Sequence, residues 1–407
     1  MTKPLLLLIL VLLLNTSLLM AQGDGSPVKA PPVDTIDKVD LIDIARGIVH
    51  VKHRVPTDKR KIYFSILPLS SSGVNSGKAL ITSTTAGFYL GDPKTTNISS
   101  VNFAPYLNFH GRYGLPIHSS IWLKDNQYTI QGDTRYLVYP QYTWGLGGGQ
   151  SNDDKFLVDY KYIRFYQSVL KKIKPYFFAG IGYNLDYYVD IGTDNGNAKT
   201  FRQFTGYQFG TNPTENSFSA GPSINLLYDT RNNSINPLPG YYANIIYRYS
   251  TTVLGSSNAW QTLYLDGRKY LSLTEETKRK NMLAFWGYYW TSLSSGTPYL
   301  SLPSIGMDPN QRSGRGIDQN RYRGNSLIYF ESEYRRDLTD NGLFGFVVFA
   351  NVNSASQPNS RQFRFWNPAV GTGLRIKFNK NSDTNVGIDY GVSKGYSSLS
   401  FNLGEAF

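Results

Sequence analysis

Apolar and polar residues alternate in segment after segment of this chain, from residue 61 to its last residue. A period of two places neighbouring side chains on opposite faces of a strand, so each segment predicts a β-strand with one apolar face. About sixteen such segments follow one another, and sequence patterns fix their ends only to within a few residues. The predicted strands cover residues 62–69, 79–90, 99–110, 116–123, 128–139, 157–169, 176–190, 217–229, 241–253, 259–272, 282–294, 326–338, 343–353, 370–378, 385–392 and 398–407.

The connections between the predicted strands differ in length in a regular way. Short connections cover residues 171–174, 274–281, 339–341 and 379–384, and long ones cover residues 140–156, 191–216, 295–325 and 354–368. Bacterial outer-membrane barrels have short turns at one end, long loops at the other and strands of roughly ten residues. A soluble β-sandwich has no reason to lengthen every second loop. We therefore predict an all-β fold, a transmembrane antiparallel β-barrel of about sixteen strands.

The alternation also predicts which face of a strand meets lipid. In the segment 370–378, Arg375 and Lys377 fall on the face opposite the bulky apolar residues. An arginine facing lipid at mid-bilayer costs roughly 2–4 kcal/mol, so the charged face is predicted to line the lumen. Aromatic residues near strand ends are typical of interfacial girdles. The candidates are Tyr139, Tyr142, Trp144, Tyr187, Tyr188, Tyr241, Tyr242, Tyr288, Tyr289 and Trp290.

The first 60 residues differ from the rest. A basic start, an apolar core at residues 5–14 and Ala21 before Gln22 predict a secretory signal peptide over residues 1–21. We expect residues 22–60 to form a periplasmic tail with a short helix, and residues 61–407 to form the barrel. The apolar core is shorter than the roughly 20 residues that a membrane-spanning helix needs. No later segment is apolar for 18 residues, so strands must make any spans there.

Composition excludes several classes of function. The chain has no cysteine, which excludes disulfides, thiolate metal sites, a cysteine nucleophile and a lipidated cysteine. Charged residues make up only 17% and aromatic residues 14%, whereas soluble domains carry roughly a quarter charged residues. The net charge of +12 is spread along the chain without long runs, so nucleic acid is not an expected partner. We expect these basic residues either to face outer-membrane lipids with anionic headgroups or to line a lumen.

Several short motifs follow one another in a specific order. Near the end of the strand 217–229 and in the turn after it stand Tyr228, Asp229, Arg231, Pro237 and Gly240. Farther along are Arg315-Gly316-Ile317, then Glu333-Tyr334-Arg335, Gly371-Thr372-Gly373-Leu374-Arg375 and Gly387-Ile388-Asp389-Tyr390-Gly391. Over about residues 61–407 this order resembles the BamA/TamA-type bacterial surface-antigen barrels, which are outer-membrane insertases and two-partner translocators.

The resemblance implies a loop that enters the lumen between the eleventh and twelfth strands, with Arg315, Gly316 and Ile317 at its tip. An arginine fork held by carboxylate or amide oxygens can anchor such a loop. The inward candidates for its partners are Glu331, Glu333, Asn351 and Asp389. The family has an aspartate where this chain has Asn351 and an aromatic residue where it has Ile317. These two differences imply either a weaker anchor or a shift of the partner to Glu333 or Asp389. The alternative is that Arg315 is a solvated loop residue.

The end of the chain resembles the terminal signal of outer-membrane barrels. Leu399, Phe401, Leu403 and Phe407 alternate up to a terminal aromatic residue, and Glu405 is expected at the periplasmic rim. Gly404 and the short first strand are compatible with a weak junction between the first and last strands. Residues 22–60 are too few for a periplasmic POTRA module, so the chain resembles a POTRA-less, barrel-only branch of the superfamily.

The resemblance implies a barrel that assembles or translocates outer-membrane components by opening, without bond chemistry. Outer-membrane protein clients or components of the assembly machinery are then candidate partners. The alternative is a passive pore or structural barrel, with Arg335, Arg375 and Lys377 setting an anion preference. A hydrolase is a weaker alternative, because no acid is expected near a histidine and no third metal ligand is near His50 and His53. We expect no catalytic residue, metal or cofactor. The histidines are His50, His53, His110 and His118.

Overall fold

The computed structural model describes the barrel region and one helix before it. The described residues are 38–48, 62–73, 77–108, 113–138, 140–193, 199–212, 216–274, 279–309 and 311–407. The predicted signal peptide, most of the predicted tail, His50, His53, His110 and Tyr139 lie outside the described residues. No helix within the described ranges has the length and apolar character needed to cross a membrane.

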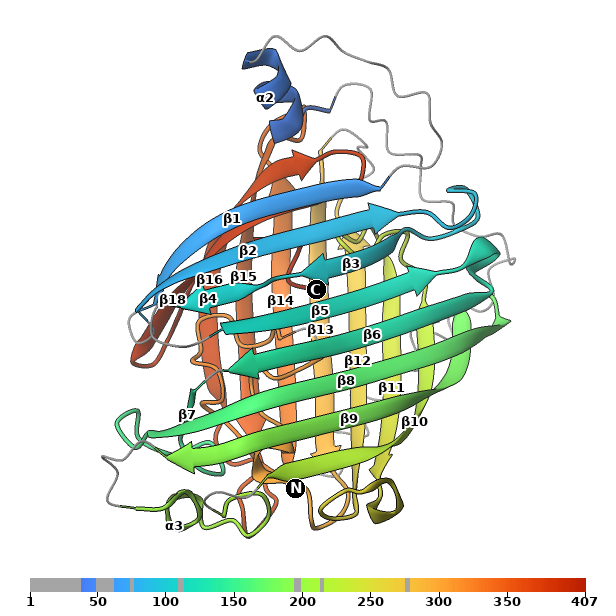
Figure 1. The fold of residues 1–407 in the computed structure, drawn as a ribbon. Helices are drawn as coiled ribbons and strands as arrows, with labels where there is room; N and C mark the ends of the chain where they lie inside the picture. Colours follow the sequence, from blue (N-terminus) through green and yellow to red (C-terminus); the bar gives the residue numbers. More distant parts are fainter. Residues whose placement is uncertain are drawn as a thin grey trace. The chain divides into compact units, whose positions relative to one another are not determined.

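Antiparallel β-strands make up nearly all of the regular structure (Figure 1). The strands are β1 (Tyr63–Gly73), β2 (Gly77–Phe88), β3 (Ser99–Phe103), β4 (Tyr106–Asn108), β5 (Tyr113–Trp122), β6 (Tyr128–Val138), β7 (Gln141–Thr143), β8 (Phe156–Lys174), β9 (Phe177–Thr193), β10 (Ser217–Asp229), β11 (Gly240–Ser250), β12 (Trp260–Ser272), β13 (Asn281–Ser292), β14 (Ser326–Asp337), β15 (Phe344–Ala355), β16 (Asn367–Asn379), β17 (Thr384–Ser393) and β18 (Tyr396–Leu403). The helices are α2 (Leu41–Ile48), α3 (Phe201–Thr205) and the short 3₁₀ turns η1 (Lys124–Asn126), η2 (Thr252–Leu254) and η3 (Tyr299–Ser301).

Two of the spanning segments are interrupted. β3 and β4 both pair with β2 on one side and β5 on the other, so they form one segment broken next to Pro105. β6 and β7 both pair with β8 and are separated next to Pro140. Proline lacks the N–H that a sheet ladder needs, which explains both breaks. The eighteen described strands therefore form a nearly closed antiparallel barrel of sixteen segments, which confirms the predicted fold class.

The longest departure from the predicted strands is in β8 and β9. β8 has 19 residues and β9 has 17, so residues 171–174, predicted as a turn, are the end of β8. The turn instead consists of Pro175 and Tyr176, and Tyr176 has a positive φ of 63°. The lysine-rich sequence at 171–174 resembled a turn because its charges hid the alternation. A strand of 19 residues measures about 60 Å, so this hairpin is much longer than its neighbours.

The two faces of the wall differ as predicted. On β16, the outward Val370 is 53% exposed, whereas the inward Arg375 is only 4% exposed. The girdle prediction fails for alternate members of the aromatic pairs. Tyr188 and Tyr288 are buried on the lumen side, because consecutive residues of a strand cannot both face lipid.

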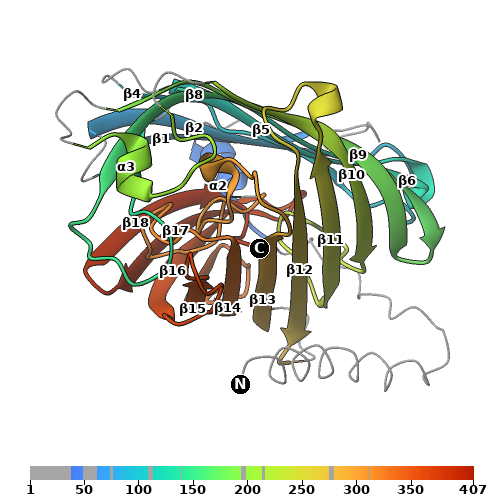
Figure 2. The ribbon, with the colours of Figure 1, turned by 90° about the horizontal axis from the view of Figure 1, so that it is seen from below.

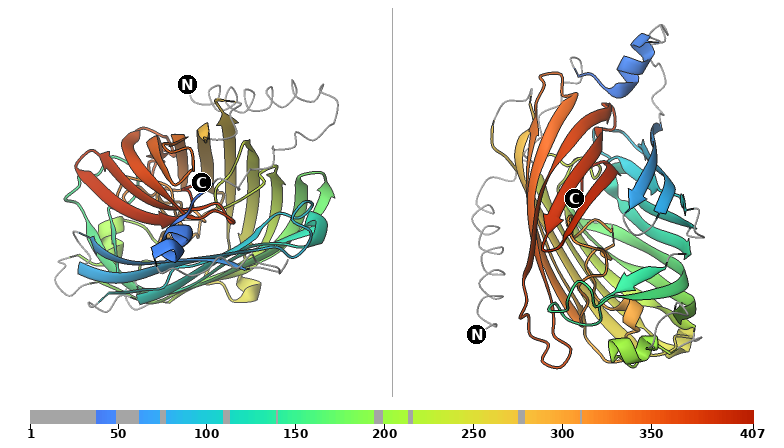
Figure 3. Two further views of the ribbon diagram at one scale, coloured as in Figure 1. Left: turned by 90° about the horizontal axis from the view of Figure 1, so that it is seen from above. Right: turned by 90° about the vertical axis from the view of Figure 1, so that its left-hand side faces the viewer.

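One junction of the barrel differs from the others. Each spanning segment from β1 to β18 pairs with the next along the chain, but no ladder of paired residues joins β18 to β1 in the part of the chain that the structure describes. We call this junction the seam. Figures 2 and 3 show the strands surrounding an interior in which the C-terminus lies. The helices α2 and α3 lie at opposite ends of the barrel, α2 at the end with short turns and α3 at the end with long loops (Figure 1).

Candidate functional site

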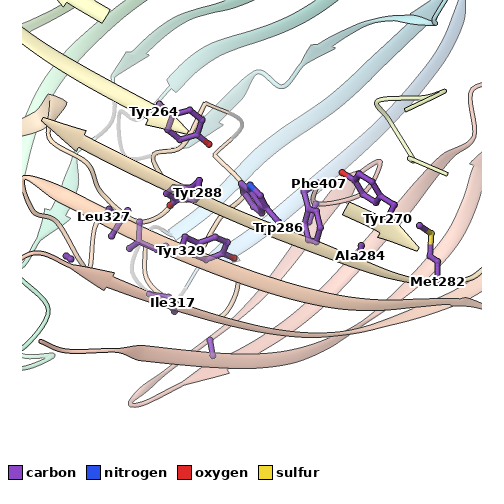
Figure 4. Close-up of a cluster of buried hydrophobic side chains, with 14 residues drawn as sticks. Tyr264, Tyr270, Met282, Ala284, Trp286, Tyr288, Ile317, Leu327, Tyr329 and Phe407 are labelled. Carbon is purple, nitrogen blue, oxygen red and sulfur yellow. The ribbon is translucent and has the colours of Figure 1, made fainter. Parts of the chain in front are cut away.

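The connection between β13 and β14, residues 293–325, folds back into the barrel, and we call it the lumen loop. Two of its backbone hydrogen bonds pair Ile305 with Tyr322 and Asn320, at 3.0 Å each. Ile305 and Ile317 are buried in an aromatic cluster on the inner wall (Figure 4). The other members of this cluster are Tyr264, Tyr270, Met282, Ala284, Trp286, Tyr288, Leu327, Tyr329, Ala355, Ala369, Ala406 and Phe407. The loop is therefore held by apolar packing as well as by polar contacts.

Arg315 lies at the tip of the lumen loop and contacts acidic residues of two strands. Its guanidinium forms ion pairs with Glu331 and Glu333 of β14 and with Asp389 of β17, and Nη1 donates to Asp389 Oδ2 at 3.0 Å. Its carbonyl accepts a hydrogen bond from Asn351 Nδ2 at 2.9 Å. The side chain is 7% exposed, so it is not a solvated loop residue. The structure thus brings together all four residues that the sequence offered as partners.

The guanidinium of Arg315 also lies over an aromatic ring. Its centre is 3.8 Å from the ring centroid of Phe349 on β15. A cation over an aromatic face gains electrostatic attraction when both are shielded from water. The inward Gly371 on β16 makes room for this ring, because a Cβ there would lie 2.3 Å from Phe349 Cζ.

Two glycines allow the loop tip to touch the backbone of β17. Gly316 has a positive φ of 82°, and a Cβ there would lie 2.7 Å from the backbone nitrogen of Val392. A Cβ on Gly391 would lie 2.7 Å from Gly316 Cα. Both positions therefore require glycine. The contact between Gly391 and the loop tip was not predicted from the sequence. The sequence shows only that a glycine stands at an inward position of this strand.

The acids that hold Arg315 also bind other arginines. Glu333 Oε1 accepts from Arg335 Nε at 2.5 Å, and Asp389 Oδ1 accepts from Arg375 Nη1 at the same distance. Arg375 Nε in turn donates to Glu405 at 2.8 Å. Buried charges are tolerated when each is paired and hydrogen-bonded. The result is a continuous network from the loop tip through β14, β16 and β17 to the end of the chain.

Residues 404–407 turn into the lumen, and we call them the terminal tail. β18 ends at Leu403, one residue before Gly404, whose φ is +85°. Phe407 is 3% exposed and packs against Trp286 and Tyr270, with ring centroids 5.3 Å and 6.2 Å away (Figure 4). The predicted last strand, 398–407, is therefore too long. Leu399 faces outward, Phe401 is half-buried and Leu403 is buried.

The position of Glu405 also differs from the expectation of a water-exposed rim. It is 6% exposed, and its carboxylate accepts from Arg375 and from Asn385 Nδ2 at 2.7 Å. Arg312 of the lumen loop donates to the carbonyl of Glu405 and, at 3.2 Å, to that of Leu403. Sequence reasoning missed Arg312, because nothing local marks a loop arginine that reaches the end of the chain. The lumen loop and the terminal tail are thus directly connected.

The turn motif lies in the connection between β10 and β11, residues 230–239, which we call the crossing connection. Arg231 donates twice to Asp229, at 2.9 Å and 2.8 Å, while Tyr228 faces outward. Pro237 is buried in the connection and Gly240 begins β11.

The crossing connection reaches elements on both sides of the seam. The carbonyl of Ile235 accepts from the backbone N–H of Glu405 at 3.0 Å, and Asn236 Nδ2 donates to the carbonyl of Asp383 at 3.1 Å. On the other side, Asn97 Nδ2 donates to the carbonyl of Arg231 at 3.4 Å. The connection therefore joins the turn after β2 to the turn after β16 and to the terminal tail.

A polar cavity of about 820 Å³ occupies the lumen beside the loop tip. Its wall carries a chain of ion pairs in which Arg164 contacts Asp133 at 3.0 Å and Asp186 at 3.3 Å, and Arg248 contacts Asp186 at 2.5 Å. The acids and arginines of the wall thus neutralise one another. Hydroxyl and amide side chains, among them Ser119, Ser120, Gln131 and Asn225, make up much of the remaining lining.

The surroundings of His118 correct one expectation. Asp133 lies opposite His118 in the ladder between β5 and β6, and its Oδ1 is 3.5 Å from His118 Nδ1, although no acid was expected there. His118 and Asp133 are close because of the register between β5 and β6, and this register cannot be predicted from the sequence of either strand alone. Asp133 is occupied by Arg135 and Arg164, and no hydrogen bond joins His118 to Ser119 or Ser120 in the described residues. Within those residues, no three potential ligands form a metal site.

Comparison with known proteins shows what the fold is similar to. No family model matches the chain, and no curated protein matches its sequence. Among solved structures, a BamA from Haemophilus ducreyi lacking POTRA domains 1–3 matches with a TM-score of 0.50 and 14% identity, over 84% of this chain and 69% of that chain. The chain has the barrel fold of BamA.

Two CdiB structures share the same fold. CdiB from Acinetobacter baumannii matches with a TM-score of 0.51 and 12% identity, over 84% of this chain and 65% of that one. CdiB from Escherichia coli matches with a TM-score of 0.51 and 12% identity, over 89% and 69%. The chain thus spans 65–69% of the length of these BamA and CdiB structures. At this identity the likeness concerns the fold alone.

Proposed function

We propose that this chain is an integral barrel of the bacterial outer membrane, exported by its signal peptide, which assists the assembly or translocation of other outer-membrane components. It acts by opening at the seam, without bond chemistry. The outward face of apolar and tyrosine side chains and the charged lumen support the membrane location. The fold shared with BamA and CdiB supports the class of function.

The missing ladder at the seam carries this proposal. Every other junction between spanning segments is laddered in the described residues, where β1 and β18 each have a ladder on one side only. In hydrocarbon each unsatisfied backbone group costs several kcal/mol, so pairing a strand edge with another strand lowers the free energy. A strand of a client can pair with such an edge as well as the opposite edge of the barrel can.

Reconstitution with disulfide trapping tests the proposal. The chain has no cysteine of its own, so cysteine pairs placed along β1 and β18 report on the seam without background. We expect the unaltered barrel in liposomes to accelerate the folding of a client barrel, and a disulfide across the seam to abolish this acceleration until it is reduced. Client folding that is equally fast with the seam cross-linked would contradict the proposal.

A matched control places the disulfide in a laddered junction. Tyr334 and Val348 face each other across β14 and β15 on the outer wall, so the pair Tyr334→Cys and Val348→Cys cross-links the barrel without closing the seam. Acceleration of client folding should survive this cross-link.

The polar cavity supports a second candidate, a passive pore. A cavity of about 820 Å³ lined by ion pairs and hydroxyls is compatible with solute passage. Residues of the lumen loop and of the terminal tail also line this cavity, which favours a closed resting state. Ion conductance without any effect on client folding would establish the pore instead.

A further inference from the structure

The connection between β15 and β16 carries arginines and aromatic residues close together at the end with long loops. Its residues 361–366 are Arg361, Gln362, Phe363, Arg364, Phe365 and Trp366. Both arginines are exposed, and neither forms an ion pair with a described residue. Trp366 is 47% exposed, although a buried position would stabilise so large an apolar side chain. This combination is unlike the neutralised arginines of the lumen.

The outward face of β16 continues into this connection. Every second residue is exposed in the series Arg364, Trp366, Pro368, Val370, Thr372 and Leu374. Trp366 directly precedes Asn367, the first residue of β16, and lies four residues before Val370, while Arg364 lies six residues before it. Apolar, aromatic and cationic groups therefore follow one another in the order of hydrocarbon, interface and phosphate in a lipid leaflet.

A groove crosses the outer wall at the level of Val370. It has a volume of about 460 Å³, within the range of small-ligand pockets. Its outward lining is mainly apolar and consists of Leu283, Ser332, Tyr334, Val348, Ala350, Val370, Thr372, Tyr390 and Val392. No charged group belongs to this outward lining, so the groove suits a hydrocarbon chain.

The surroundings of the connection are net positive. Lys394, in the turn after β17, is exposed one residue beyond Ser393, which pairs with Ala369 of β16. The carbonyl of Lys394 accepts a hydrogen bond from Asn152 at 3.3 Å. The loop that contains Asn152 therefore lies beside Lys394, and it carries two acids and one lysine. The exposed charges of this surface are thus Arg361, Arg364, Lys394 and Lys155 against Asp153 and Asp154.

We propose that this surface binds a lipopolysaccharide molecule of the outer leaflet. Arg361 and Arg364 bind its phosphates, Trp366 lies at the level of its sugar and ester groups, and one acyl chain lies in the groove at Val370. Arginine forks match phosphate oxygens in pairs, which favours a phosphorylated headgroup over a neutral one. The inference rests on the proposed outer-membrane location, which places the long loops next to this leaflet.

Lipid retention by the full-length mature barrel tests the inference. The protein is reconstituted in phosphatidylcholine nanodiscs with a small fraction of bisphosphorylated lipid A and repurified, and the bound lipid A is counted by native mass spectrometry. We expect the double variant Arg361→Gln and Arg364→Gln to retain at least ten-fold less lipid A than the unaltered barrel. The matched control, Lys199→Gln with Arg202→Gln, removes two exposed cations from another loop at the same end and should retain as much as the unaltered barrel.

A second variant and a second lipid separate the headgroup from the chain. Val370→Phe fills the groove without changing any charge and should also lower retention, while dephosphorylated lipid A with the same acyl chains should be retained poorly by every variant. Equal retention by the arginine variant and its control, or equal retention of the two lipids, overturns the inference. A chain that inserts into no bilayer refutes the membrane location itself, whereas insertion without selective retention refutes only the lipid site.

Discussion

A single arginine holds the tip of the lumen loop. Arg315 forms ion pairs with Glu331, Glu333 and Asp389, and its substitution by alanine leaves these buried acids with one cation fewer. Breaking a buried ion pair from one side costs about 3–5 kcal/mol. We expect Arg315→Ala to loosen the loop and raise the single-channel conductance in planar bilayers. The same variant should unfold at lower denaturant concentration in detergent.

The control for this variant is an arginine that lies outside the lumen. Arg202 in α3 is exposed and donates to Asn212 at 3.1 Å, so Arg202→Ala removes one guanidinium from a loop at the same end of the barrel. Its conductance should equal that of the unaltered barrel. Unchanged conductance in Arg315→Ala would count against a loop that obstructs the lumen.

The partners of Arg315 were predictable and its other contacts were not. The alternation of the strands places three acids, Glu331, Glu333 and Asp389, on the face opposite the apolar residues. A charged side chain is unstable in lipid, so the sequence already predicts that these acids face the lumen. The approach of Gly316 to Gly391 joins residues 75 positions apart and depends on the path of the loop. The hydrogen bond from Arg312 to the carbonyl of Leu403 also depends on the path of the loop, so it could not be predicted either.

At the scale of elements, α2 docks on the turn between β16 and β17 through Lys380. Lys380 Nζ forms an ion pair with Asp43 at 2.8 Å, and its backbone N–H donates to Asp40 at the same distance. Burial opposes ionisation of Asp43, but the hydrogen bond and charge of Lys380 outweigh it and lower the pKa of this carboxyl below its ordinary value of 3.8.

This pair makes docking of α2 dependent on pH. Because the pKa is lower in the docked helix, the contribution of the pair is complete above pH 3.8 and is lost as the pH falls below 3.8 through the lowered value. We expect the amides of α2 to lose protection in this acidic range, measured by mass spectrometry as the exchange rate relative to that of an unstructured peptide at the same pH. Lys380→Ala should show low protection at every pH, and a pH-dependent step that persists in this variant would assign the effect to another group.

Strands were predictable because a period of two survives over many residues, and the ends of strands were not. The alternation of Leu399, Phe401 and Leu403 continues in register to Phe407 only if Gly404 and Glu405 stay extended. The φ of +85° at Gly404 turns the chain inward instead, and Glu405 finds Arg375 there. Local sequence permits both conformations of a glycine, so only the position of the inner arginine decides between them.

At the scale of the whole molecule, three segments meet where the seam has no ladder. The terminal tail binds the crossing connection through the carbonyl of Ile235, and Arg312 of the lumen loop donates to the carbonyls of Leu403 and Glu405. The tail directly follows β18, so its attachment inside the lumen restrains one edge of the seam. Opening of the seam by movement of β18 therefore requires these contacts to break.

Glu405→Gln tests this coupling without altering the terminal aromatic residue. The substitution removes the charge that pairs with Arg375, so the tail should leave the lumen more readily and cysteines across the seam should form a disulfide several-fold faster. Asp186→Asn is the control, because it weakens buried pairs with Arg164 and Arg248, away from the terminal tail, and should not change the trapping rate. Equal trapping rates in both variants would mean that the seam opens independently of the tail. Faster trapping in Glu405→Gln alone would make the lumen network a restraint on β18, and the same variant should then accelerate client folding.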